Sequence, residues 1–137
     1  MAEPLHIKND INQLTKVNEY LQQAVWELAL SASARMSLKL AVEEAVVNAI
    51  LYAYPGETEK DIFVRLEYNE EKITVVMTDY GRPFDLTASK DPDISLPLEE
   101  RPIGGLGAFL VKQLMTEVSY RRVGNRNVLT MVKLIHP

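Results

Sequence analysis

Cysteine is missing from this sequence of 137 residues, and the 15 basic residues are fewer than the 19 acidic ones. Without cysteine the chain forms no disulfide and offers no thiolate ligand to a metal. The lack of cysteine does not indicate whether the protein's compartment is oxidising or reducing. The formal net charge of −4 gives no general attraction to nucleic acid or to an anionic membrane. We therefore expect no direct nucleic-acid partner and no membrane partner.

Long apolar runs are also missing, so the sequence predicts no membrane-spanning helix. Residues 1–10 have no apolar signal core, and the cytoplasm is the expected location. Only two histidines are present, His6 and His136, and their places near the chain ends suggest chance rather than a phospho-acceptor role. The length and ordinary globular composition predict one domain, residues 1–137, with a hydrophobic core that needs no disulfide or metal to stabilise it.

Two helices are predicted in the first half of the chain. Helical spacing of apolar residues predicts the first helix over about residues 10–30, capped by Asn9 or Asp10 and broken by Ser31 to Ser33. The second runs from about Ala34 to Tyr54. It carries two apolar stripes and is therefore predicted to be buried on more than one side. The stripes are Leu38, Val42, Ala45 and Ala49, and Leu40, Val47 and Leu51.

Alternating patterns predict strands around these helices. A short first strand around residues 5–7 precedes them, residues 62–68 and 73–78 predict one hairpin, and residues 118–123 and 128–135 predict another. Between the hairpins, residues 82–103 contain four prolines and no period, which is typical of a lid or binding loop. A helix from the glycines at 104–107 to about Glu117 follows. This order predicts an α+β, two-layer fold, with helices on one face of a mixed, mostly antiparallel sheet.

Glu44 and Asn48 are the first candidate site residues. They lie four residues apart on the second helix and therefore share a face, among small and apolar neighbours. Burying a carboxylate and an amide there is costly unless something pairs with them, and Mg²⁺ with a phosphate would do so. The alternative is a solvated helix edge with Asn48 bonded locally, and for this pair taken alone that alternative is favoured.

Asp79 and Gly81 follow an apolar strand. A carboxylate there can accept a hydrogen bond from an exocyclic amine such as that of adenine, and glycine lets the backbone approach a ligand closely. An ordinary turn after a strand uses the same residue types.

The glycine-rich segment Gly104-Gly105-Leu106-Gly107 opens the last helix. Open backbone N–H groups and the positive end of a helix suit phosphate. No Lys-Ser or Lys-Thr follows, so this is not a P-loop, and the alternative is a flexible hinge.

The order of these three motifs resembles that of the GHKL ATPase superfamily, over about residues 34–135. The segments Glu-Ala-Val-Val-Asn-Ala-Ile (44–50) and Gly-Gly-Leu-Gly-Ala-Phe-Leu-Val (104–111) look most like those of the short anti-sigma-factor serine kinases. The resemblance implies a Bergerat-type ATP-binding fold, with ATP and Mg²⁺ as cofactors. It also implies an anti-anti-sigma (STAS-domain) protein, a sigma factor, or both as partners, and a possible homodimer.

The resemblance also implies roles for single residues. Glu44 would be the general base and Asn48 the Mg²⁺ ligand. Asp79 would bind the adenine amine with Gly81 beneath the base. Thr130 would help to hold Asp79. The phosphates would be wrapped by Gly104, Gly105, Leu106 and Gly107.

Two positions depart from the family pattern. Pro83 stands where the family has its second glycine, and proline has no N–H to offer a nucleotide. The arginine often found just before the phosphate glycines is out of register, and Arg101 is the nearest candidate for a phosphate contact.

Two functions fit these residues. The first is a serine/threonine protein kinase that transfers the γ-phosphoryl of ATP to a partner, and Glu44 favours it. The second is an ATP-gated module that sequesters a sigma factor or other regulator without chemistry, and Pro83 and the displaced arginine favour it. A histidine-kinase fragment fits less well, because no phospho-acceptor helix pair is present. The sequence favours the kinase.

Overall fold

The computed structural model describes residues 3–25, 28–88 and 105–135 of the chain. Five strands, three α-helices and two 3-10 turns are found in these ranges. In chain order they are β1 (Leu5–Lys8), η1 (Ile11–Gln13), α1 (Leu14–Val25), α2 (Ala32–Tyr52), β2 (Asp61–Tyr68), β3 (Lys72–Asp79), η2 (Leu86–Ala88), α3 (Gly105–Leu114), β4 (Glu117–Val123) and β5 (Arg126–Leu134).

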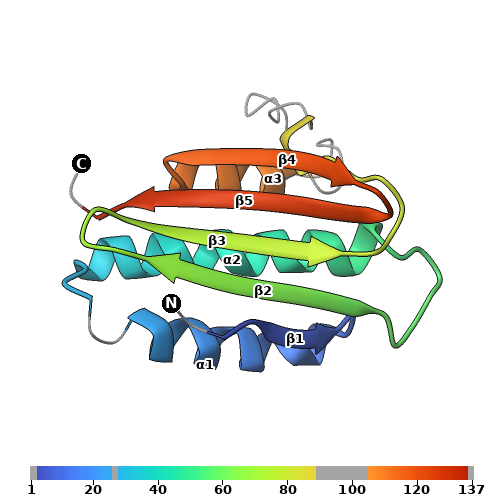
Figure 1. Cartoon of the computed structure of the whole chain (residues 1–137), viewed down its shortest axis with the longest axis horizontal. Helices are drawn as coiled ribbons and strands as arrows, with labels where there is room; N and C mark the ends of the chain where they lie inside the picture. Colours follow the sequence, from blue (N-terminus) through green and yellow to red (C-terminus); the bar gives the residue numbers. More distant parts are fainter. Residues whose placement is uncertain (1–2, 26–27, 89–104, 136–137) are drawn as a thin grey trace.

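The strands form one sheet in the order β1-β2-β3-β5-β4, with the helices on a single face (Figure 1). The predicted two-layer α+β fold is confirmed. The expected parallel component is not found in the described part of the sheet, because every pairing is antiparallel. Two α-helices lie between β1 and β2, so the chain reverses direction three times and the two strands are antiparallel. Strands β3 and β4 are joined through one helix, but β5 lies between them.

The first predicted helix is shorter than expected. Asp10 caps a 3-10 turn by accepting a hydrogen bond from Asn12 N at 2.9 Å, and α1 ends at Val25. Ser31 does not break a helix but begins one, because its hydroxyl accepts from Ala34 N at 3.0 Å at the start of α2. A serine at this position satisfies a backbone N–H that the helix itself leaves unpaired.

Helix α2 crosses the inner face of the sheet and buries only one of its two apolar stripes. Leu38 and Val42 are buried, as predicted. Leu40 and Leu51 are 38% and 55% exposed, so the prediction of burial on more than one side was wrong. Sequence spacing shows that two stripes exist, but it does not show that only one neighbouring layer is available to cover them.

The core lies between this helix layer and the inner face of the sheet. Alternate residues of β2 and β3 point into it, and the same alternation in β5 brings Leu129 and Met131 inward. The two predicted hairpins are confirmed, and Gly124 makes the second turn with a φ of +60°. Within the described ranges, no helix is both long and apolar enough to cross a membrane.

Candidate nucleotide site

Asp79 is a buried carboxylate at the end of β3, where only 3% of the residue is exposed. The pairing of β3 with β5 places it opposite Asn127. Its Oδ1 accepts from the backbone N–H of Gly81 at 2.9 Å and from Asn127 Nδ2 at 2.8 Å. Both of these bonds use Oδ1, so Oδ2 is the atom that can accept a hydrogen bond from a ligand.

Asn127 is the centre of this network, and sequence reasoning missed it. Besides Asp79, its Nδ2 donates to the carbonyl of Arg82 at 2.7 Å. Its Oδ1 accepts from the backbone N–H of Phe84 at 3.2 Å, from the Tyr120 hydroxyl, and from an Arg122 guanidinium nitrogen. A buried amide with its hydrogen bonds satisfied fixes the parts that it joins. Asn127 therefore ties the carboxylate of Asp79 to the segment that follows Gly81.

Thr130 does not hold Asp79, which corrects the expectation drawn from the family. Thr130 pairs with Val76 and lies three residues from Asn127 along β5. Successive side chains of a strand point to opposite faces, so Thr130 faces away from the helices while Asn127 faces toward them. The available signal was the alternation in β5, where Asn127 shares the inward parity of Leu129.

Burial shifts the ionisation of Asp79. Loss of solvent around the carboxylate raises its pKa, while the hydrogen bonds from Asn127 and Gly81 and the charge of Arg122 lower it. Burial dominates, so the pKa of Asp79 lies above its ordinary value. The network partly offsets the cost of keeping this carboxylate ionised inside the protein.

Gly81 is a glycine for a packing reason. A Cβ at this position would lie 2.2 Å from the carbonyl oxygen of Ala53, and the next residue, Arg82, donates its N–H to the same oxygen at 2.9 Å. The close approach is therefore to the C-terminal end of α2. This contact locks the Asp79–Gly81 turn against the helix that carries Glu44.

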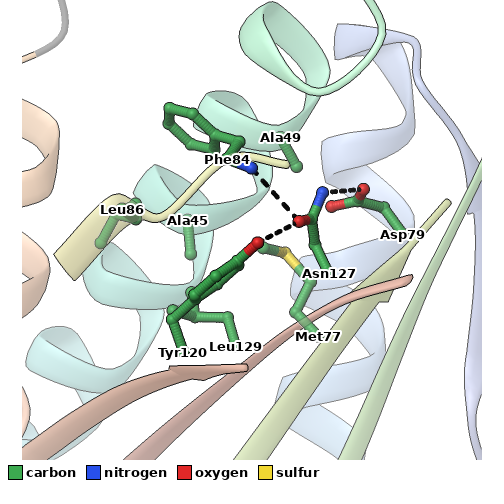
Figure 2. Close-up of a pocket in the computed structure, with 9 residues that line it drawn as sticks. All are labelled: Ala45, Ala49, Met77, Asp79, Phe84, Leu86, Tyr120, Asn127 and Leu129. Atoms are coloured by element: carbon green, nitrogen blue, oxygen red, sulfur yellow. Dashed lines mark hydrogen bonds between the residues drawn. The ribbon is translucent and has the colours of Figure 1, made fainter. Parts of the chain in front are cut away.

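A pocket lies beside Asp79, between α2 and the inner face of the sheet (Figure 2). Its walls are mostly apolar, with one carboxylate and one amide. The free volume inside is about 10 Å³, close to the least that holds one water molecule. A flat base therefore enters only if the Phe84–Leu86 side opens. The lining residues are Ala45, Ala49, Met77, Asp79, Phe84, Leu86, Tyr120, Asn127 and Leu129.

Glu44 and Asn48 lie on α2 next to the pocket residues Ala45 and Ala49, on the side of the helix that meets α3. Asn48 is buried, and its Nδ2 donates to the backbone carbonyl of Glu44 at 2.7 Å. This bond uses the amide nitrogen, so the carbonyl oxygen is the atom suited to a cation. Glu44 and its neighbour Glu43 are both half-buried, and Glu43 lies 3.8 Å from the ammonium group of Lys39. The local bond of Asn48 is the one that the alternative expected, but the exposed edge is not found, because Asn48 is buried and both glutamates are half-buried.

Gly107 brings the glycine segment onto this pair. A Cβ at Gly107 would lie 2.7 Å from Glu44 Oε2 and 3.0 Å from Asn48 Nδ2. Nothing larger than glycine fits without moving the two side chains. The structure thus joins two motifs that lie about sixty residues apart in the sequence. These are the Glu44–Asn48 pair of α2 and the start of α3.

Some predicted residues lie outside the described ranges. Gly104 and Arg101 are among them, as is the 89–103 part of the predicted lid. Gly105 and Leu106 form the first turn of α3, as expected for a helix that opens at the glycine segment.

Residues 7–133 match the family described as the histidine kinase-like ATPase domain. This match covers most of the chain. The chain belongs to that family. Membership implies that ATP is the nucleotide used by the fold, in agreement with the resemblance seen in the motifs.

Curated relatives of this ATPase domain include serine-protein kinases named RsbW. The protein from Listeria monocytogenes is 39% identical over 85 residues, which cover 59% of this chain and 54% of the relative. The protein from Bacillus subtilis is 33% identical over 99 residues, which cover 69% of this chain and 59% of the relative. The chain thus matches little more than half the length of these relatives.

Solved structures support the fold. The RsbU and RsbW domains of Rv1364c from Mycobacterium tuberculosis align with a TM-score of 0.62 at 18% identity, over 99% of this chain and 34% of that one. The histidine kinase domain of a blue-light activated kinase from Erythrobacter litoralis aligns with a TM-score of 0.57 at 16% identity, over 94% of this chain and 62% of that one.

Proposed function

We propose that this chain binds Mg·ATP between α2, the end of β3 and the start of α3, and phosphorylates a serine or threonine of a partner protein. The observation that carries the proposal is the packing of Gly107 against Glu44 and Asn48. It sets a candidate phosphate loop against a candidate base and a candidate metal ligand. The serine-protein kinase names of the relatives support the same reaction.

The base-binding half has the chemistry that adenine requires. The pocket offers apolar walls for a flat ring, and Asp79 Oδ2 accepts a hydrogen bond from the exocyclic amine. Gly81 and Asn127 fix the direction of that carboxylate through their bonds to Oδ1. Guanine carries a carbonyl in place of the amine, so the same carboxylate disfavours it.

The phosphate half has the donors that a triphosphate requires. The start of α3 offers the N–H groups of Gly105, Leu106 and Gly107, and Gly104 and Arg101 are proposed to add to them. Asn48 would hold Mg²⁺ through its carbonyl oxygen. When bound, the cation neutralises charge on the phosphate oxygens.

Glu44 supplies the group that handles the proton. It accepts the proton of the partner's hydroxyl while that oxygen bonds to the γ-phosphorus. The bond from the γ-phosphorus to the bridging oxygen breaks, and ADP and a phosphorylated partner result. The half-buried position beside Gly107 keeps the carboxylate next to the phosphate loop.

The proposal includes the setting of the reaction. The partner is an anti-anti-sigma protein of the STAS type, a sigma factor is a second partner, and the protein acts in the cytoplasm, with a homodimer as its possible assembly. Residues 82–103 act as a lid, because Phe84 and Leu86 narrow the base pocket and must move for ATP to enter.

One observation favours a second function. Pro83 is exposed and offers no N–H, and its neighbours Arg82 and Phe84 are held by Asn127 through their backbones. A segment held in this way can transmit nucleotide binding to a surface without any chemistry. An ATP-gated module that sequesters a regulator would need only this property.

Glu44→Gln separates the two functions. A glutamine keeps the shape of the side chain but accepts no proton, so Mg·ATP should bind as in the parent while transfer to a partner serine falls by about 10²–10⁴-fold. Phosphorylated partner would be quantified by mass spectrometry. Glu43→Gln is the matched control and should transfer at the parental rate, because Glu43 pairs with Lys39 instead. Transfer at the parental rate by Glu44→Gln would remove Glu44 as the base. Absence of transfer by the parent, with ATP-dependent binding of a sigma factor, would favour the module.

A further inference from the structure

A second hollow lies on the face of the sheet that no helix covers, the face turned to the viewer in Figure 1. Its volume is about 220 Å³, which is room for a side chain, since one water takes about 30 Å³ of liquid. We call it the outer groove. It is lined by Pro4, Phe63, Arg65, Val76, Thr78, Tyr80 and Arg126, and none of these residues lines the base pocket.

The outer groove combines aromatic surface with positive charge. His6 stacks on Phe63 with ring centroids 4.7 Å apart, and Phe63 meets the edge of Tyr80 at 6.2 Å. Tyr80 is 46% exposed, which is high for a large aromatic residue. The charged residues of the lining are both arginines, Arg65 and Arg126. This mixture of a flat apolar surface and guanidinium groups is typical of the anchor points of protein interfaces.

The charge of the outer groove is opposite to that of the whole chain. The protein carries −4, yet no carboxylate lines this hollow. The nearby Asp61 already pairs with Lys8 and His6, and Glu67 lies 3.3 Å from Arg65 Nε. Within the described ranges Arg126 forms no ion pair. Arg65 is thus already paired with Glu67, and among the described residues Arg126 is the unpaired arginine of the lining. One unpaired guanidinium suits a carboxylate of a peptide, whereas tracking a nucleic-acid backbone needs a longer positive path.

We propose that the outer groove is a docking site for an acidic segment of a partner protein. One large apolar side chain of that segment lies over Phe63 and Val76 against Tyr80. A carboxylate on one side of it meets Arg126, and a carboxylate on the other side meets Arg65 in exchange for the contact with Glu67.

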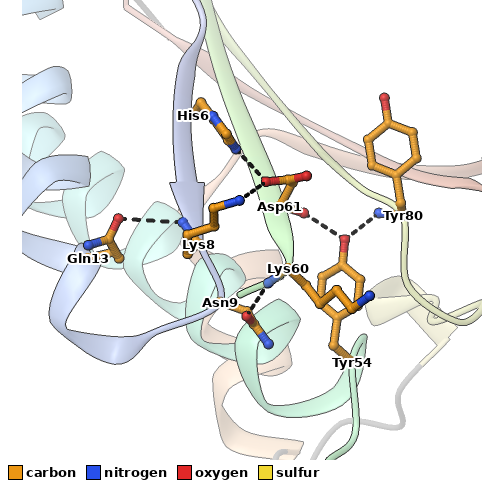
Figure 3. Close-up of polar contacts among 8 residues, drawn as sticks. All are labelled: His6, Lys8, Asn9, Gln13, Tyr54, Lys60, Asp61 and Tyr80. Carbon is orange, nitrogen blue, oxygen red and sulfur yellow. Dashed lines mark hydrogen bonds and ion pairs between the residues drawn. The ribbon is translucent and has the colours of Figure 1, made fainter. Parts of the chain in front are cut away.

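Docking there is connected to the base pocket through two pairs of adjacent residues. Asp79 faces the pocket and Tyr80 faces the outer groove, and in β5 Asn127 and Arg126 divide in the same way. The Tyr54 hydroxyl also holds this end of the sheet, since it accepts from Tyr80 N at 2.7 Å and donates to the carbonyl of Asp61 at 2.6 Å (Figure 3). A segment that fixes Tyr80 and Arg126 therefore steadies Asp79 and Asn127. This connection rests on the proposed ATP site, whereas docking itself does not.

The first experiment measures docking without nucleotide. The probe is a fluorescein-labelled peptide in which a phenylalanine is flanked on each side by glutamates, and the control peptide has glutamine at those positions. Fluorescence anisotropy should show that the glutamate peptide binds and the glutamine peptide does not, and that added salt weakens the binding. Arg126→Gln should weaken it by about two- to five-fold, as expected for an exposed ion pair, and Arg65→Gln should weaken it less, because Arg65 already pairs with Glu67. Arg121→Gln is the matched control, because Arg121 is an exposed residue of β4 outside the lining, and it should change the affinity little.

Three results would overturn the proposal. The first is equal affinity for the glutamate and glutamine peptides, or an equal loss in Arg121→Gln and Arg126→Gln. The second is tighter binding of an oligothymidylate than of the peptide at the same groove. The third is self-association of the free protein that Tyr80→Lys abolishes, because the face would then belong to a second copy of the chain.

The second experiment measures the connection. Mg·ATP should raise the affinity of the protein for the glutamate peptide. The peptide should raise the affinity for ATP by the same factor, because coupling between two sites is reciprocal. Peptide binding with no response to bound ATP would overturn the connection and leave docking in place. Failure of ATP to bind at all would count against the proposed function, and the first experiment would still decide the docking site.

Discussion

Two glycines at opposite ends of the candidate site, Gly81 and Gly107, are close-packed for different reasons. Gly81 presses on backbone, with 2.2 Å between an added Cβ and the carbonyl oxygen of Ala53. Gly107 presses on side-chain ends, with 2.7 Å to Glu44 Oε2. The turn after Asp79 is thus fixed by backbone packing, whereas the start of α3 rests on the ends of two side chains, Glu44 and Asn48. The first should respond to mutation in stability and the second in activity.

The largest effect that separates the two halves is expected from Gly107→Ala. The new methyl group displaces the carboxylate of Glu44, which turns away at little cost because it is the end of a flexible side chain. Misplacement of a reacting group by about 1 Å costs on the order of 10²-fold in rate. Phosphotransfer to the partner should fall by about this factor, while the melting temperature stays near that of the parent. A variant that loses stability and keeps its transfer rate would contradict the comparison.

Gly81→Ala should show the opposite response. Backbone atoms of Ala53 cannot step aside without moving the end of α2, so the change should destabilise the fold by about 1–3 kcal/mol, the usual cost of overpacking. Thermal unfolding followed by circular dichroism would measure it. An unchanged melting temperature would show that the turn after Asp79 is free to shift, and that backbone packing does not fix it.

Asn127→Asp should change the pH dependence of ATP binding. A second carboxylate beside Asp79 disfavours ionisation of the pair, so the already raised pKa of Asp79 rises further. Protonated Asp79 accepts a hydrogen bond less well. ATP affinity should therefore weaken as the pH falls, several-fold and from a higher pH than in the parent. Calorimetric titrations between about pH 5 and pH 8 would test this shift.

The stability of the free protein should respond to Asp79 with the opposite sign. The pKa of this group is raised in the folded state, so its contribution is fully present below the unfolded pKa and is lost as the pH rises through the folded pKa. Acid therefore favours folding at this residue while it weakens ATP binding. If both quantities moved in the same direction with pH in the parent and in Asn127→Asp, another group would control the profile.

The sequence predicted the parts of this site that lie within single elements. The Glu44–Asn48 spacing, the aspartate at the end of β3 and the glycines at the start of α3 all follow from local rules. The sequence did not predict the partner of Asp79, because that partner depends on the register between β3 and β5. That register places Asn127 opposite Asp79, and Thr130 opposite Val76 on the other face. A strand pattern predicts faces, but pairing between distant strands is decided by the assembled sheet.

The exposure of the second apolar stripe of α2 was not predicted, for a similar reason. Leu40 and Leu51 extend an apolar stripe that is real in the sequence, yet no described element covers it. The wholly antiparallel sheet of the described residues likewise follows from the insertion of β5 between β3 and β4, which neither hairpin reveals by itself.

The central claim is that Asp79 accepts a hydrogen bond from the adenine amine in a site that binds a Mg²⁺-bound triphosphate. Isothermal calorimetry with Mg·ATP and Mg·GTP tests this claim. Mg·ATP should bind at one site per chain, more weakly when EDTA removes the metal, and more tightly than Mg·GTP. Asp79→Asn should weaken ATP by about 1.5–3 kcal/mol, the value of a hydrogen bond to a charged group, and should narrow the gap between the two nucleotides. Equal affinity for ATP and GTP in the parent, or an Asp79→Asn variant that binds ATP as the parent does, would contradict the account.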